Sequence, residues 1–238
     1  MYIKLIIKIL SLFDFFYKKK IINFLKKEKF NNIDVLIDVG SHHGETICLF
    51  RKNFSINSFF GFEPSPINYK ILKNNIKKFN DKKIKIFNYA LGDAKGELQL
   101  NQSIESQSTT LLNVNKRSKY FERKKRVLSL RSREYFNETF FVKVETLKNF
   151  INENKIDNIG FLKIDTEGYD FNVIMGLGDN IQKVRYIYFE HHFHDMFKKK
   201  YTLTKVHNYL KEKNFEKVFK IKMMFRKTFE YIYCNKNL

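Results

Sequence analysis

The stretch VLIDVGSHHGET, from Val35 to Thr46, runs from apolar residues into an aspartate, two glycines and two histidines. A continuous apolar run is typical of a central strand that is covered on both faces of a parallel sheet. Gly40 allows a sharp turn after such a strand, and Gly44 allows the next helix to come close to a ligand. The stretch therefore predicts a strand, a ligand-binding turn and a helix, although the adjacent histidines also raise the alternative of a metal site.

Strand-like and helix-like patterns alternate along the chain. Strands are expected at Asp34–Val39, Ser58–Phe62, Ile84–Tyr89, Phe161–Asp165 and Arg185–Phe189. Helices are expected at Glu45–Asn53, Pro66–Lys78, Thr146–Asn154 and from Tyr169 to about Met175. This alternation predicts a doubly wound α/β fold, with helices on both faces of a mostly parallel seven-stranded sheet. Beyond a helix near 202–213, two β-rich stretches predict an antiparallel pair at the C-terminal edge of the sheet.

The length of 238 residues suits one domain. We divide the sequence into an N-terminal amphipathic helical segment, residues 1–30, and an α/β domain, residues 31–238. Within this domain, residues 101–141 are polar and then strongly basic, and their periodicity is weak. A stretch of this length in a compact domain is usually an active-site lid or a disordered segment. We therefore interpret residues 101–141 as a basic insert or lid.

The chain is strongly basic, with 45 lysine and arginine residues against 25 acidic ones and a formal net charge of +20. Such a charge indicates an anionic partner, which would be nucleic acid, anionic lipid or an acidic glycan. Lysine, asparagine, isoleucine and phenylalanine are abundant along the whole chain, however, and the lysines form no single stripe. Compositional drift is therefore the simpler explanation for most of the charge.

The N-terminal segment begins MYIKLIIKILSLFDFFYKKK, and charged residues interrupt its apolar run at Lys4, Lys8 and Asp14. The run falls short of the roughly 20 apolar residues that a membrane span needs. The segment either lies on an anionic membrane surface or packs on the domain, and its helical spacing favours packing. Cys48 and Cys234 have no metal-ligand spacing, which fits a reducing compartment. We expect a cytoplasmic protein, with peripheral membrane contact through residues 1–30 as the alternative.

The turn after the first strand favours a cationic ligand without phosphate. Its glycine spacing, Gly40-x-x-x-Gly44, departs from the dinucleotide fingerprint and offers no obvious pyrophosphate cradle. Asp38 would repel phosphate but suits a cationic amino group. Glu63 ends the next strand, close to the offset of about 20 residues at which an acidic residue binds ribose hydroxyls. Together these residues predict a site for a nucleoside that carries a positive charge.

Two later stretches, LKIDTEGYD at residues 162–170 and VRYIYFEHH at residues 184–192, resemble the Rossmann-type S-adenosylmethionine-dependent methyltransferases, and within them the FkbM family. NYALGDAKGEL, at residues 88–98, is also similar to a segment of that family. The resemblance covers about Val35 to His192. It implies that residues 31–238 form a Rossmann-type methyltransferase domain. SHHG departs from the small and amide residues that are commoner there, which leaves the role of the histidine pair open.

The resemblance implies S-adenosylmethionine as the cofactor. It implies that Asp38, Gly40 and Gly44 hold the methionine end, that Glu63 binds the ribose hydroxyls, and that the Ala90–Leu91 backbone borders the adenine. We expect His42 to contribute its backbone, with its side chain at the rim of the pocket. Asp165 and Glu190, at the ends of neighbouring strands, would face the transferring methyl group and the acceptor.

Methyl transfer to a hydroxyl also requires a base. The candidates are Asp165, Glu190 and His191, the last from a cluster that includes His192, His194 and Asp195. Lys163 is either another base or the partner of a carboxylate. Asp165, Glu190 and His192 would also be the ligands if a divalent metal were bound. We expect no metal, because no spacing here matches a defined ligand motif.

The sequence thus predicts an S-adenosylmethionine-dependent O-methyltransferase that acts on a hydroxyl of a glycan or another small or lipid-linked metabolite. One alternative is an RNA methyltransferase that uses the basic run Lys116–Arg133. No RNA-binding module is recognisable, so nucleic acid is not the expected partner. A second alternative is a non-catalytic module that residues 1–30 dock to a membrane.

Overall fold

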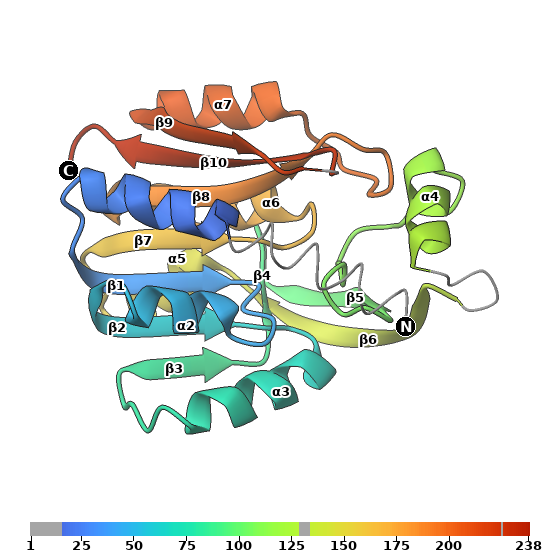
Figure 1. The fold of residues 1–238 in the computed structure, drawn as a ribbon. Coiled ribbons are helices and arrows are strands. Elements are labelled where there is room, and N and C mark those ends of the chain that lie inside the picture. Colours follow the sequence, from blue (N-terminus) through green and yellow to red (C-terminus); the bar gives the residue numbers. More distant parts are fainter. Residues whose placement is uncertain (1–15, 129–133, 225) are drawn as a thin grey trace.

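The computed structural model describes residues 16–128, 134–224 and 226–238. Its centre is a seven-stranded sheet with the strand order β3-β2-β1-β7-β8-β10-β9 (Figure 1). The strands are β1 (Asn32–Val39), β2 (Ser55–Phe62), β3 (Ile84–Phe87), β7 (Ile159–Ile164), β8 (Val184–His192), β9 (Phe215–Lys222) and β10 (Thr228–Asn235). Strands β3, β2, β1, β7 and β8 are parallel, whereas β10 runs antiparallel to both β8 and β9. The predicted seven-stranded sheet with its antiparallel C-terminal edge is confirmed.

Helices cover both faces of this sheet. The helices are α2 (Glu45–Arg51), α3 (Pro66–Lys77), α4 (Lys119–Val127), α5 (Leu147–Glu153), α6 (Asp170–Met175) and α7 (Leu203–Glu212), with a 3₁₀ helix η1 (Gly178–Lys183). One apolar cluster packs α5, α6 and α7 on the sheet, and it includes Phe150, Val173 and Leu210. A second cluster packs α2 and α3 on the opposite face through Phe50 and Leu72. The doubly wound arrangement predicted from the alternating patterns is therefore present.

The N-terminal segment packs on the domain where the structure describes it. Residues 16–27 form a helix, and its side chains Ile21, Ile22 and Leu25 are buried in the same cluster as α2 and α3. Residues 1–15 of the predicted amphipathic segment lie outside the described residues. Within the part of the chain that the structure describes, no helix is both long enough and apolar enough to cross a membrane.

A second, three-stranded sheet was not predicted. It consists of β4 (Ala90–Leu91), β5 (Gly96–Ser103) and β6 (Phe136–Glu145), in the order β4-β6-β5. The stretch 101–141, which we interpreted as a basic insert or lid, contains the end of β5, helix α4 and the first part of β6. Most residues of β6 are exposed or half-buried, so its sequence lacks the apolar alternation of a strand that covers a core. These elements lie beyond the carboxyl ends of the parallel strands (Figure 1).

The carboxyl end of β1 is the topological switch point of the sheet. Strand β1 pairs with β2 on one side and with β7 on the other, so the chain order reverses there. The turn after β1 is very tight: Gly40 has φ +81°, and a Cβ atom added to it would lie 1.9 Å from the carbonyl oxygen of Asp165. The loops after β1 and β7 are therefore in direct backbone contact.

This contact predicts that Gly40→Ala destabilises the protein by about 3 kcal/mol or more, because a left-handed backbone and a backbone clash combine. Gly96→Ala is the matched control, since a Cβ atom at Gly96 has no neighbour within 4 Å. The control should change stability by no more than about 1 kcal/mol. Urea unfolding measures both variants, and equal effects would contradict the tight contact.

Candidate active site

A cavity of about 1060 Å³ opens at the carboxyl ends of the parallel strands. Its two ends differ in chemistry. We call the first the loop end, lined by residues 40–45 after β1, by Glu63 after β2, and by Ala90 and Leu91 of β4. We call the second the carboxylate end, lined by Asp165, Glu167, Glu190 and Glu230. The order of the strands places the loop end over β2 and β1 and the carboxylate end over β7, β8 and β10.

Backbone hydrogen bonds fix the shape of the loop end. The amides of Gly40 and Ser41 both donate to the carbonyl of Phe62 over 2.9 Å, which ties the turn to the end of β2. The amide of Gly44 donates to the carbonyl of Ser41 over 2.8 Å. His42 has φ +47°, in the left-handed region that few residues other than glycine adopt. The turn is therefore a compact and rigid wall for a ligand.

Glu63 organises the same wall. Its Oε2 accepts a hydrogen bond from the amide of His42 over 2.8 Å, and its Oε1 accepts one from the amide of Ser65 over 2.9 Å. Burial raises the pKa of Glu63 to about 7, despite these two hydrogen bonds. The carboxylate therefore gains or loses its proton near neutral pH. Glu63 thus joins the turn after β1 to the turn after β2.

Asp38 forms an ion pair with Lys163. It is completely buried and does not line the cavity, whereas Lys163 does. The Nζ atom of Lys163 lies 3.0 Å from Oδ1 of Asp38 and 3.4 Å from Oδ2 of Asp165. Burial favours the neutral amine, but the two carboxylates outweigh it and raise the pKa of Lys163. Lys163 is therefore a fixed cation and not a base, and it joins the ends of β1 and β7.

The carboxylate end contains acidic side chains from the neighbouring strands β8 and β10 and from the loop after β7. Glu190 of β8 and Glu230 of β10 are directly opposite each other in the antiparallel pairing. Asp165 follows Ile164, whose partner in β8 is Phe189, so Asp165 continues this row. Burial, and then the neighbouring carboxylates, raise the pKa of Glu190 well above its usual range. Neighbouring carboxylates repel each other when both are ionised, so one of them tends to keep a proton. Carboxyl groups with pKa values shifted in this way often exchange a proton with a ligand.

The predicted histidines divide between the two faces of the sheet. Glu190 lines the cavity, and alternation along β8 turns His191 to the opposite face, where its ring packs against Phe193 and Tyr201. Burial, and then nearby lysine charge, lower the pKa of His191 to about 4. His191 therefore does not lie in the cavity wall, and the structure separates it from the carboxylates with which we grouped it.

His192 is buried next to two carboxyl groups of the carboxylate end. Its Nε2 lies 3.5 Å from Oε2 of Glu167, and its Nδ1 lies 3.7 Å from Oε1 of Glu190. Burial lowers its pKa well below the usual range, so the ring is neutral. His194 instead stacks on Tyr120, with 4.0 Å between the ring centroids. Of the histidines in the cluster, His192 is thus the one in contact with the acidic side chains.

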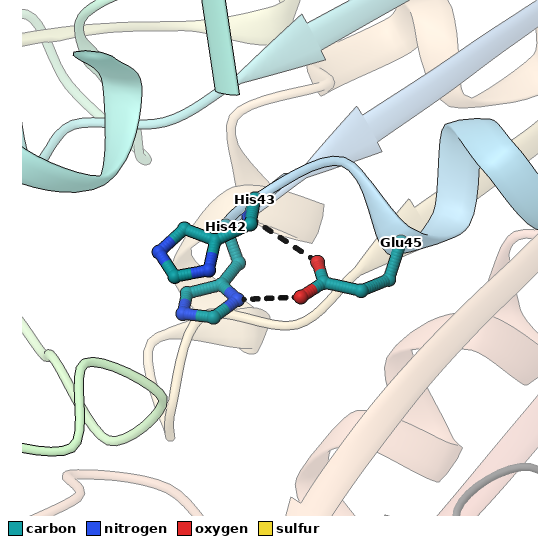
Figure 2. A group of neighbouring side chains, drawn as sticks. All are labelled: His42, His43 and Glu45. Atoms are coloured by element: carbon teal, nitrogen blue, oxygen red, sulfur yellow. Dashed lines mark hydrogen bonds and ion pairs between the residues drawn. The ribbon is translucent and has the colours of Figure 1, made fainter. Parts of the chain in front are cut away.

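The structure brings together a different metal-ligand set from the one we considered. Among the described residues, ligand atoms of His42, His43 and Glu45 all lie within 4.8 Å of one another (Figure 2). Within the part of the chain that the structure describes, Asp165, Glu190 and His192 do not form such a group.

Sequence reasoning missed three residues of the carboxylate end: Glu167, Tyr188 and Glu230. Glu167 lies inside the quoted LKIDTEGYD stretch, so a signal was present. Tyr188 shares the face of Glu190, two residues away on β8, and strand alternation would have found it. Glu230 depends on the register between β8 and β10, which the sequence does not reveal.

The buried ion pair leads to a prediction about stability. Lys163→Met leaves Asp38 buried without its cation and should destabilise the protein by about 3–5 kcal/mol. Adding Asp38→Asn should restore part of the loss, because the uncompensated charge is gone. Denaturant unfolding of the two single variants and the double variant measures this coupling. Additive losses would show that the two side chains do not act as a pair.

Comparisons with known proteins agree with this geometry. The family model described as a methyltransferase FkbM domain matches residues 38–217. Among solved structures, methyltransferase FkbM from Methylobacillus flagellatus KT is similar with a TM-score of 0.55 and 14% identity. The match covers 84% of this chain and 43% of the other, so this chain spans less than half of that protein.

The structure of Streptococcus pneumoniae Sp1610, described as a putative tRNA (m1A22) methyltransferase in complex with S-adenosyl-L-methionine, is similar with a TM-score of 0.50. The identity is 11%, and the match covers 92% of this chain and 72% of the other, so the likeness concerns the fold. Curated proteins gave no match. The family match extends over the loop end and over Asp165, Glu167 and Glu190 of the carboxylate end, and the chain belongs to the FkbM methyltransferase domain family.

Proposed function

We propose that the protein is an S-adenosylmethionine-dependent O-methyltransferase that methylates a hydroxyl of a glycan or another small or lipid-linked metabolite. One observation carries this proposal. A single cavity joins a rigid loop end, which has the residues for a cationic nucleoside, to a row of buried carboxyl groups that can take a proton.

The residues of the loop end fit this cofactor. Glu63 offers carboxylate oxygens for ribose hydroxyls, and Ala90 and Leu91 provide an apolar wall for a base. Asp38 does not line the cavity, so it would support the methionine end through its ion pair with Lys163 and not by direct contact. When bound, S-adenosylmethionine supplies an electrophilic methyl group on a positively charged sulfur.

The chain's own residues then position the acceptor and remove its proton. The acceptor oxygen must approach the methyl group in line with the carbon–sulfur bond. A carboxylate of this end would take the hydroxyl proton of the acceptor as the acceptor is methylated. We assign the proton acceptor to Glu190, because it lines the cavity in the middle of the row, between Asp165 and Glu230. Asp165 is held by Lys163 beside it and orients the acceptor.

The carboxylate end also favours a neutral acceptor. Four acidic side chains line it, and they would repel a phosphate or a carboxylate. Lys163 and Arg226 also line the cavity, and Lys163 is already paired with Asp38 and Asp165. On α4, by contrast, Lys119, Arg123 and Arg126 are exposed. We therefore favour a polyhydroxylated acceptor over RNA. RNA binding that weakens steeply with salt and depends on these residues of α4 would favour the nucleic-acid alternative.

The first prediction concerns the cofactor. The protein should bind S-adenosylmethionine more tightly as the pH rises through about 7, because only the ionised Glu63 accepts two hydroxyl hydrogen bonds. Glu63→Gln should bind more weakly and lose this part of the pH dependence. Isothermal titration calorimetry across this pH range measures both proteins. A wild type that does not bind the cofactor would refute the proposal.

The second prediction concerns the base. Glu190→Gln should bind S-adenosylmethionine as the wild type does and should slow methyl transfer by about 10²–10⁴-fold. His191→Gln is the matched control, because it is the next residue on the same strand and faces away from the cavity. Mass spectrometry of glycans and lipids from cells with and without the protein identifies the acceptor for this assay. Equal rates in Glu190→Gln and the wild type would exclude Glu190 as the base.

A further inference from the structure

We propose that His42, His43 and Glu45 form a binding site at the rim of the loop end. The site would take a divalent transition-metal ion such as Zn²⁺, which accepts both nitrogen and oxygen ligands. In Figure 2 the two imidazole rings lie against each other and the Glu45 carboxylate faces them. The rings are stacked with 3.7 Å between their centroids, and Nδ1 of His42 lies 3.0 Å from Oε1 of Glu45. Ligand atoms of a tetrahedral zinc ion are separated by roughly 3.3 Å, as follows from metal–ligand distances near 2 Å. This inference goes beyond the proposed methyl transfer and does not depend on it.

The backbone that carries these side chains is already fixed. The amide of His42 is hydrogen-bonded to Glu63, and the carbonyl of His43 accepts a hydrogen bond from Nδ2 of Asn75 over 2.9 Å. The amide of His43 donates to Oε2 of Glu45 over 3.2 Å, which orients the carboxylate. A site whose ligands are held in place loses little conformational entropy when an ion binds.

The short contact between His42 and Glu45 requires a positive group between its two atoms. A carboxylate oxygen and an unprotonated ring nitrogen are both electron-pair donors, and they repel each other at 3.0 Å. In the absence of an ion, a hydrogen on Nδ1 fills this role. A divalent cation takes the place of that hydrogen on Nδ1, and the neutral ring then carries its one hydrogen on Nε2. The remaining ligand, His43, has an Nε2 atom that is buried and lacks a hydrogen-bond partner among the described residues.

A second residue orients His42 for this role. Nε2 of His42 lies 2.7 Å from the hydroxyl oxygen of Ser106. When Nδ1 binds a metal, Nε2 carries the ring hydrogen and donates it to Ser106, which is the usual arrangement behind a histidine ligand. Ser106 belongs to the stretch between β5 and α4, so an ion would link this stretch to the turn after β1.

The donor set selects the class of ion. Two nitrogens and one carboxylate oxygen suit Zn²⁺, Co²⁺ or Ni²⁺, whereas Mg²⁺ and Ca²⁺ prefer six or more oxygens. Three protein ligands leave a fourth position of a tetrahedral ion open. All three residues line the cavity, so that position is accessible to water or to a ligand in the loop end.

The test is a competition titration of the full-length, chelator-treated protein with Zn²⁺ against a chromophoric chelator, in excess Mg²⁺. One equivalent should bind. Glu45→Gln and His42→Asn should each weaken binding by at least about 10-fold, and Ser106→Ala by about 10-fold. Asparagine tolerates the positive φ of position 42, so this variant keeps the turn. Zn²⁺ should raise the melting temperature of the wild type but not that of Glu45→Gln.

Two control variants make the result specific. Cys48→Ser removes a thiol that also lines the cavity, one turn after Glu45, and His207→Gln removes a histidine on α7. Neither should change the affinity for Zn²⁺. The Co²⁺ complex should show visible bands of nitrogen and oxygen coordination without a thiolate charge-transfer band. Absence of stoichiometric binding, equal affinity in Glu45→Gln, or loss of binding in Cys48→Ser would each overturn the proposal.

Discussion

The contact between the backbones of Gly40 and Asp165 is the constraint on which the site depends. No side chain fits at position 40, because a Cβ atom there would overlap the carbonyl oxygen of Asp165. The amide of Asp165 also donates to the carbonyl of Val39 over 2.9 Å, and Lys163 bridges Asp38 and Asp165. The ends of β1 and β7 are thus joined by backbone and by charge. This joint brings the turn after β1 and the acidic loop after β7 to the same cavity.

The charge at the carboxylate end of the cavity is opposite in sign to the charge of the chain as a whole. The chain carries a net charge of +20, yet four carboxyl groups line one end of its cavity. Such a cluster is costly unless its members share protons, pair with cations or meet a ligand. Lys163 meets part of this need. The net charge of a chain therefore does not predict the chemistry of its interior site, where local burial and neighbours decide the protonation states.

The sequence predicted the sheet well because its central strands are buried on both faces. Leu36 and Ile37 of β1 are fully buried, and so are Phe161 and Leu162 of β7, so their apolar runs were easy to recognise. Strand β6 was missed because it lies at the surface and exposes residues such as Phe141, which is 74% exposed. Its partner β5 is similarly half-exposed. Patterns of burial reveal a strand only where that strand covers a core.

The site was predictable to the extent that neighbouring strand ends define it. Gly40, Glu63, Asp165 and Glu190 all line the cavity as expected from their places after parallel strands. Pairings between distant residues were not predictable, and these include Glu190 with Glu230 and His42 with Ser106. They depend on strand register and on the path of the stretch between β5 and α4, which no local pattern specifies.

A crystal structure of the protein with S-adenosylhomocysteine tests the central claim most directly, because it places both ends of the cofactor at once. Our account predicts that the ribose hydroxyls bind Glu63 at the loop end. It also predicts that the sulfur faces Asp165 and Glu190 at the carboxylate end. A nucleoside bound at the carboxylate end, with its sulfur turned away from both acidic residues, would contradict it.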